Sequence, residues 1–141
     1  MSNVLPVRRL DPAAHLPTRA HADDAGLDLY ALEDVAIETG AGLLIRTGVA
    51  VAVPVGHVGL VCDRSSMAKR GLKTAGGVID AGYRGELGVM VWNLSRERQH
   101  VKKGERCAQM LVIPIATPAP VDSADLGETA RGAGGFGSTG R

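Results

Sequence analysis

Short apolar runs, interrupted by glycine or proline from one end of the chain to the other, are the feature that most limits how this sequence can fold. The 141 residues include 19 Gly and 7 Pro, which predicts many turns. Aromatic residues make up only 3% of the chain, so the core must be built from aliphatic side chains. This pattern favours one compact all-β domain, either a sandwich or a barrel.

The predicted strands lie between these turns. The clearest alternation runs from Leu43 to Val53, where the side chains expected to share one face are Ile45, Val49, Val51 and Val53. A hairpin is expected to join residues 76–80 to residues 83–94, with its turn at Ala81-Gly82. The other predicted strands cover Val4–Leu10, Leu27–Ala31, Val35–Glu38, Val58–Cys62 and Cys107–Ile115.

One short helix is predicted at Ser65–Arg70. A serine can cap its start, and the basic residues Lys69 and Arg70 suit its C-terminal end. Gly71 can end the helix because glycine tolerates the left-handed backbone conformation. After Pro118 the sequence shows no further β pattern.

Charge and cysteine content limit the partners and the compartment. The formal net charge of +1 provides no global field that would recruit nucleic acid or an anionic membrane. Cys62 and Cys107 each lie in an apolar run, which suits buried free thiols in a reducing compartment. There is no signal-peptide pattern, and no segment approaches the roughly 20 apolar residues of a membrane span. We therefore expect a cytoplasmic protein.

The last segment, residues 127–141, differs in kind from the preceding domain, residues 1–126. It is rich in glycine and cannot build a core, so it should be a flexible arm. Glycines let backbone N–H groups approach phosphate oxygens, Ser138 and Thr139 add hydroxyl donors, and Arg131 adds a bidentate cation. Phe136, the only phenylalanine, can stack on a nucleobase. A plain disordered tail is the alternative.

Polar side chains at four other places also suit nucleotide chemistry. Arg64 lies at the predicted helix start, where free N–H groups and the helix dipole favour phosphate. Asp80 lies at the predicted hairpin turn, and an aspartate aimed into a cleft can orient and deprotonate a water. Asp28 interrupts an apolar strand and needs a partner, a metal or exposure, while Gln109 can donate to phosphate. Taken singly, helix capping explains Arg64-Ser65 better, turn chemistry explains Asp80 better, and a routine polar strand position explains Gln109 better.

Five short segments carry these residues in a fixed order. They are Ala25-Gly-Leu-Asp28-Leu, Asp63-Arg64-Ser65-Ser66, Gly76-Gly-Val-Ile-Asp80-Ala-Gly-Tyr83-Arg-Gly, Lys103-Gly-Glu-Arg-Cys-Ala-Gln109 and Arg131-Gly-Ala-Gly-Gly-Phe-Gly-Ser-Thr-Gly140. Together they closely resemble the five motifs of the trimeric dUTP diphosphatase family. The resemblance implies a distorted jelly-roll or β-barrel with one short helix, assembled as a homotrimer with three active sites at subunit junctions.

The resemblance also implies a role for each residue. Such enzymes use Mg²⁺ to hydrolyse dUTP to dUMP and pyrophosphate, which keeps uracil out of DNA and supplies dUMP for dTMP synthesis. Asp80 would orient the water that attacks the α-phosphorus, and Asp28 would hold Mg²⁺ through water. The implied substrate-binding residues are Arg64, Ser65, Ser66, Gly77, Val78, Ile79, Tyr83, Gln109, Arg131, Phe136, Gly137, Ser138 and Thr139.

The same resemblance divides each site among three chains. The segments around Asp28, Arg64 and Gln109 would come largely from one chain, residues 80–83 from a second, and the arm from a third. Tyr83 would leave no space for a ribose 2′-hydroxyl. The backbone of residues 76–79 would bind the uracil edge, and the phenylalanine of the arm would cover the base.

The sequence departs from the family pattern in two places. Asp63 stands where many relatives have proline before the arginine, and Ser66 stands where they have glycine. Thr74-Ala75-Gly76 replaces an asparagine-alanine-proline run that many relatives carry, which favours backbone over side-chain contacts to uracil.

Other functions remain open. The dCTP deaminase family shares the fold and the Arg-Ser-Ser segment, but it places a glutamate on the strand after the hairpin, where this chain has Met90. Deamination, alone or in a bifunctional enzyme, would lack its proton shuttle. A non-catalytic nucleotide-binding trimer would keep the phosphate donors without needing Asp80 or the arm, and both are present here. A purely structural trimer ranks lowest.

Overall fold

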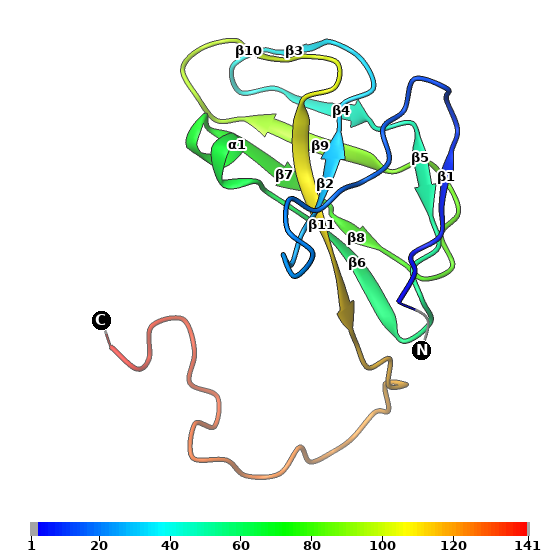
Figure 1. Cartoon of the computed structure of the whole chain (residues 1–141). Helices are drawn as coiled ribbons and strands as arrows, with labels where there is room; N and C mark the ends of the chain where they lie inside the picture. Colours follow the sequence, from blue (N-terminus) through cyan, green and yellow to red (C-terminus); the bar gives the residue numbers. More distant parts are fainter. Residues whose placement is uncertain (1–2, 141) are drawn as a thin grey trace.

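The computed structural model describes residues 3–140, so the outermost residues of the predicted domain and arm, 1–2 and 141, lie outside it. The fold is antiparallel β throughout, with one short helix, α1 (Ser65–Lys69), between β6 and β7 (Figure 1). The strands are β1 (Val7–Arg9), β2 (Leu27–Tyr30), β3 (Val35–Ile37), β4 (Gly42–Arg46), β5 (Val49–Val51), β6 (His57–Cys62), β7 (Leu72–Ala75), β8 (Val78–Ile79), β9 (Gly88–Asn93), β10 (Gln99–Val101) and β11 (Arg106–Pro114).

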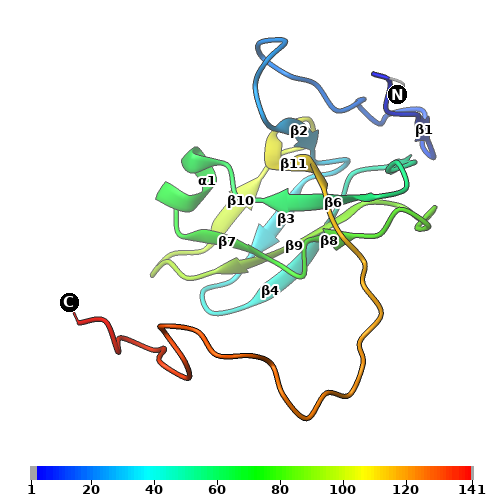
Figure 2. The same ribbon diagram turned by 90° about the horizontal axis from the view of Figure 1, so that it is seen from below.

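Two larger sheets enclose the core. One has the strand order β2-β11-β6-β8 and the other β4-β9-β7, while β1-β5 and β10-β3 form two-stranded additions. Figure 2 shows β6 lying over the layer that contains β9 and β4. Strands far apart in the sequence are neighbours in both sheets, and this confirms the predicted jelly-roll-like all-β architecture.

The core is aliphatic, as the low aromatic content predicts. The face predicted from the alternation is correct, since Ile45, Val49, Val51 and Val53 are all buried. Their partners come from both sheets. Among the largest fully buried side chains are Leu29, Ile37, Leu72, Leu87, Val89 and Met110.

Two predicted strand boundaries are wrong in an informative way. The run from Leu43 to Val53 is broken between β4 and β5, where Gly48 has a φ of 70°. This left-handed conformation is one that glycine adopts without strain. The first strand is also shorter than predicted, because only Val7–Arg9 pairs with β5.

The hairpin predicted over residues 76–94 does not exist. β8 pairs with β6, whereas β9 pairs with β4 and β7. The segment between β8 and β9 is held elsewhere, because Leu87 donates its N–H to the carbonyl of Val49 (2.8 Å) and accepts from the hydroxyl of Thr47 (2.6 Å). These contacts draw the chain into the other sheet.

The helix is confirmed, but its predicted cap is wrong. α1 ends at Lys69, and Gly71 has a φ of 80°, as expected for a glycine that ends a helix. The N-cap residue is Arg64, and no side chain caps the helix. The hydroxyl of Ser66 instead accepts a hydrogen bond from Arg64 (3.2 Å).

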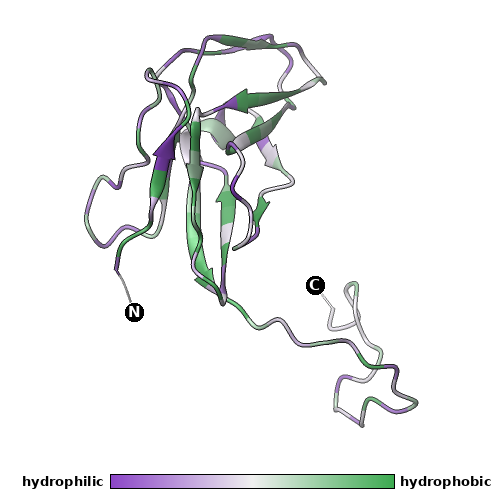
Figure 3. Cartoon of the chain, turned by 90° about the vertical axis from the view of Figure 1, so that its right-hand side faces the viewer, coloured by the Kyte–Doolittle hydropathy of each residue, from purple (hydrophilic) through white to green (hydrophobic). Residues whose placement is uncertain are grey.

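The chain after β11 leaves the β body and curves away from it (Figures 1 and 3). No strand follows Pro114 among the described residues, in agreement with the predicted loss of β pattern. Its apolar side chains, Val121, Leu126 and Phe136, are exposed. No helix within residues 3–140 has the length and apolarity to cross a membrane.

Candidate functional site

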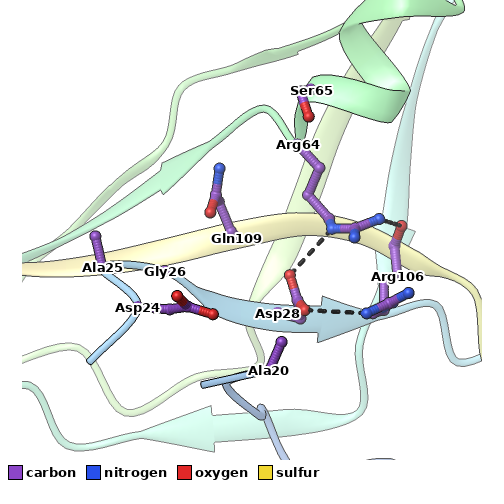
Figure 4. Close-up of a pocket in the computed structure, with 9 residues that line it drawn as sticks. All are labelled: Ala20, Asp24, Ala25, Gly26, Asp28, Arg64, Ser65, Arg106 and Gln109. Carbon is purple, nitrogen blue, oxygen red and sulfur yellow. Dashed lines mark hydrogen bonds and ion pairs between the residues drawn. The ribbon is translucent and has the colours of Figure 1, made fainter. Parts of the chain in front are cut away.

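A pocket of about 350 Å³ opens between β2, β11 and the turn from β6 into α1 (Figure 4). Its lining residues are Ala20, Asp24, Ala25, Gly26, Asp28, Arg64, Ser65, Arg106 and Gln109. The structure therefore brings together four residues that the sequence singled out in three separate segments: Asp28, Arg64, Ser65 and Gln109. β11 is central to this arrangement, because Gln109 lies opposite Asp28 on one side and Cys62 on the other.

The floor of the pocket is a carboxylate between two guanidinium groups. Asp28 is buried, and its Oδ1 accepts a hydrogen bond from Nε of Arg64 at 3.0 Å. Nη1 of Arg106 lies 3.6 Å from the other oxygen, Oδ2. The partner that an aspartate in this apolar strand requires is thus arginine. The guanidinium N–H groups that Asp28 does not engage can bind a polyanionic ligand, while Asp24, which also lines the pocket, balances the formal charge of the lining.

The side chain of Gln109 fills the space that a side chain at residue 26 would need, and that residue is glycine. Nε2 of Gln109 donates to the backbone carbonyl of Asp63 at 2.8 Å. A Cβ added at Gly26 would overlap Oε1 of Gln109 and lie 3.1 Å from its Cβ. The Ala25-Gly26 segment therefore contributes space for the glutamine amide at the pocket wall.

Asp63 fastens the strand end that carries Arg64. Its carboxylate accepts hydrogen bonds from Nζ of Lys73 (2.8 Å) and from both the N–H and the hydroxyl of Thr74 (2.7 Å each). Burial raises the pKa of the Asp63 carboxyl, but the hydrogen bonds from Lys73 and Thr74 outweigh it and lower the pKa below its ordinary value. The turn before Arg64 is thereby joined to β7 by an ionised side chain.

The other predicted site residues lie outside this pocket. Asp80 and Tyr83 belong to the turn after β8, in which the N–H of Tyr83 donates to the carbonyl of Asp80 at 3.1 Å. Ile79 is opposite Gly59 on β6, whereas Arg64 lies beyond the other end of that strand. Continuing this antiparallel register places Asp80 level with Val58, so at about 3.3 Å per residue Asp80 and Arg64 of one chain are separated by roughly 20 Å.

The arm and the segment expected to bind the base do not line the pocket either. The carbonyl of Gly77 accepts a hydrogen bond from the N–H of Val61 (2.8 Å), and a side chain at residue 77 would overlap the Val61 carbonyl. Val78 is exposed and Ile79 is buried. The remaining predicted residues lie on the arm: Arg131, Phe136, Gly137, Ser138 and Thr139. One chain therefore does not gather all the predicted residues into one site.

Arg106 is a pocket residue that the sequence did not single out. It is three residues from Gln109, and strict alternation would place the two side chains on opposite faces of β11. The pairing of β11 with β2 shifts register between Arg106 and Ala108, and such a bulge re-aims side chains. Asp24 was also missed. Within residues 3–140, no group of three or more His, Cys, Asp or Glu side chains is placed to hold a metal ion.

Comparison with known sequences gives the same assignment over nearly the whole chain. A family model described as dUTPase matches residues 12–140. The deoxyuridine 5′-triphosphate nucleotidohydrolase of Mycobacterium marinum is 49% identical, over 99% of this chain and 97% of that protein. The enzyme of the same name from Mycobacterium tuberculosis is 48% identical over the same shares.

Solved structures agree. A mutant dUTPase of Staphylococcus bacteriophage 80alpha with dUpNHpp has a TM-score of 0.91 at 33% identity, covering 99% of this chain and 100% of that chain. A mutant dUTPase from phage phi11 of S. aureus, whose structure describes the coordination of a structural Mg(II) ion, has a TM-score of 0.84 at 30% identity, covering 89% and 100%. With the fold, the motifs and relatives along nearly its full length in agreement, the chain belongs to the dUTPase family.

Proposed function

We infer that this protein hydrolyses dUTP to dUMP and pyrophosphate. The observation that carries this function is the convergence of Asp28, Arg64, Ser65 and Gln109 on one polar pocket, in a chain with the dUTPase motifs in order. A related dUTPase structure holds dUpNHpp, which supports a deoxyuridine triphosphate as the ligand.

The pocket would bind the phosphates. Arg64 presents its guanidinium with one edge fixed by Asp28 and another by the hydroxyl of Ser66, so little side-chain entropy remains to be lost on binding. Ser65 and Gln109 would add a hydroxyl and an amide donor. Phosphoryl chemistry depends chiefly on positioning and charge neutralisation, and these residues supply both.

Magnesium suits the donor set when it is held mainly by the substrate. Mg²⁺ usually keeps several waters and takes one or two carboxylates together with substrate phosphates. Asp28 is the residue that would hold it, through water, and its Oδ2 is the suitable oxygen because the contact with Arg106 is the longer one. The bound ion would supply a Lewis acid that offsets negative charge on the phosphates.

The attacking water would be oriented and deprotonated by Asp80. Because Asp80 and Arg64 of one chain are far apart compared with the reach of a triphosphate, a complete site needs the Asp80 turn of another chain. The β4-β9 sheet supports assembly as a homotrimer, since it exposes Leu44 and Trp92, with Met90 between them on the same face. Met90 is apolar where the deaminase hypothesis requires a carboxylate.

The remaining residues would complete recognition. The backbone of Gly77, Val78 and Ile79 would bind the uracil edge, and Tyr83 would lie beneath the deoxyribose. From a third chain, Arg131, Gly137, Ser138 and Thr139 would bind the terminal phosphate, and Phe136 would cover the base. Phe136 is fully exposed within its own chain, which supports a partner elsewhere. Residues 1–126 would thus form the domain and 127–141 the closing arm.

A cytoplasmic location agrees with the thiols. Cys62 and Cys107 are both free, and burial raises the pKa of the Cys107 thiol to about 12. A thiol with so high a pKa is a structural rather than a reactive group.

The direct test measures pyrophosphate and ammonia separately. The protein is incubated with Mg²⁺ and each of dUTP, dCTP, dTTP and UTP, with an EDTA-treated sample as the metal control. We expect pyrophosphate from dUTP alone, no ammonia, and loss of turnover in EDTA. Ammonia from dCTP would establish a deaminase instead, and binding of dUTP without turnover would establish a regulatory protein.

A further inference from the structure

The hydroxyl end of the Tyr83 side chain is held by the loop to which the residue belongs. Its hydroxyl donates a hydrogen bond to the backbone carbonyl of Glu86 at 2.8 Å. A Cβ added at Gly85 would overlap the Tyr83 hydroxyl and ring. The ring orientation therefore depends on where the Glu86 backbone lies.

Glu86 is fixed in turn by a two-pronged ion pair from a different strand. Nε and Nη2 of Arg46, the last residue of β4, each donate to a separate oxygen of the Glu86 carboxylate at 3.0 Å. The hydrogen bonds that Arg46 donates to Glu86, together with the charge of that carboxylate, raise the pKa of Arg46. Paired parallel hydrogen bonds of this kind fix geometry as well as adding energy.

The segment is fastened next to this pair as well. Leu87 is fully buried and is bonded through its N–H and its carbonyl to Val49 and Thr47, at the junction of β4 and β5. Arg84 donates to the carbonyls of Ala81 (2.6 Å) and Tyr83 (3.0 Å) and closes the turn from within. The Leu87 N–H belongs to the same peptide unit as the Glu86 carbonyl that receives the tyrosine hydroxyl, so Val49 holds this unit through the main chain, while the Arg46–Glu86 pair holds the side chain of the same residue.

We propose that Arg46 and Glu86 are positioning residues that set the Tyr83 ring and thereby determine the preference for deoxyribose over ribose. This inference rests on the proposed function, in which the ring lies beneath the sugar. Neither side chain needs to touch the nucleotide. A small displacement of the ring would open space for a 2′-hydroxyl, and displacements of about 1 Å can change rates by two orders of magnitude.

The experiment compares kcat/KM for dUTP and for UTP in Arg46→Ala and Glu86→Gln. We expect the dUTP-to-UTP ratio to fall by about tenfold or more in Arg46→Ala, and by less in Glu86→Gln, which keeps a hydrogen bond to Arg46. Arg46→Lys keeps the charge without the fork and should lie between wild type and Arg46→Ala. Arg98→Ala is the matched control, because Arg98 forms an exposed ion pair with Glu38 away from this loop and should leave the ratio unchanged.

The ratio separates positioning from stability. Loss of folded protein lowers both activities equally and leaves their ratio intact, whereas a displaced ring alters the ratio itself. Wild-type ratios in both Arg46→Lys and Glu86→Gln would overturn the inference, even if Arg46→Ala fails to fold. Failure of the wild type to prefer dUTP would instead overturn the proposed function.

Discussion

The carboxylate of Asp63 accepts two hydrogen bonds from Thr74, one from its backbone N–H and one from its hydroxyl, both at 2.7 Å. Each residue stands where the sequence departs from the pattern of many relatives. The two departures are therefore one structural unit, in which an ionised side chain rather than a proline ring restrains the turn before Arg64. The unit reaches the pocket wall as well, because the Asp63 carbonyl accepts the amide of Gln109.

Asp63→Asn should lower the free energy of unfolding by about 1–2 kcal/mol at pH 7. Because the pKa of Asp63 is lowered in the folded protein, its carboxylate stabilises the fold at pH above the unfolded value, near 4. That stabilisation is lost as the pH falls through the folded value. Urea titrations should thus show a constant difference between variant and wild type from pH 8 to pH 5, which shrinks in stronger acid. Glu38→Gln, at an exposed ion pair, is the control; a difference that persists at pH 3 would contradict the assignment.

Asp80→Asn should lower kcat by about a thousandfold or more while dUTP binding is retained. The amide fills the same space but cannot accept the proton of the water, and general-base catalysis typically contributes 10²–10⁴-fold. Single-turnover rates and calorimetric titration with a non-hydrolysable dUTP analogue measure the two properties separately. Glu97→Gln is the control, because it removes one negative charge at an exposed position, as Asp80→Asn removes one at residue 80. A wild-type rate in Asp80→Asn would remove this residue from the mechanism.

Deletion of residues 131–141 should cripple turnover without changing the melting temperature by more than a degree or two. From residue 114 to residue 140 every side chain is exposed except at the half-buried Gly134, so almost no packing is lost with the deleted segment. Triphosphate contacts must offset about 1–2 kcal/mol of ordering entropy per residue, so the arm closes only on substrate. Thermal unfolding tests the expected melting temperature, and initial rates test the expected loss of turnover. An unaffected rate would show that the arm is dispensable.

Gly26→Ala should raise KM for dUTP by about tenfold through Gln109. The added methyl group meets the end of a flexible side chain, so the glutamine can swing aside with a stability loss of only about 1 kcal/mol, at the expense of its bond to Asp63. Gln109→Ala should have a similar effect on KM. The double variant should be no worse than either single one, since residues acting as a unit are not additive. Additive effects would show that Gly26 acts independently of Gln109.

Local chemistry made much of the fold predictable. Ile45 and Val49 lie on the predicted face because β4 and β5, on either side of the break at Gly48, both direct these side chains into the core. Gly71 ends the helix as expected, because few other residues adopt its backbone conformation. The pairing of β9 was not predictable, because it depends on Leu87 being bonded to Thr47 and Val49, which lie about 40 residues away in the sequence.

The site was predicted by residue type but not by geometry. Asp28 and Gln109 were chosen for their chemistry, and pairing in the sheet brings them together. Arg106 was missed because strict alternation places its side chain on the face of β11 opposite to that of Gln109, whereas a bulge at residues 106–108 turns it to the same pocket. Asp80 lies far from Arg64 within one chain, and only the family pattern implied that the two residues of one site come from different chains. Composition and periodicity contain no information about contacts between chains.

The placement of Asp80 and Arg64 at opposite ends of β6 has a genetic consequence. A subunit without the Asp80 carboxylate and a subunit without its arm should each be inactive alone, yet each retains the part that the other lacks. When the two are co-expressed and assemble together, one junction in every mixed trimer should combine an intact carboxylate with an intact arm. Two null alleles of this gene should therefore complement one another, whereas two alleles that both alter Asp80 should not.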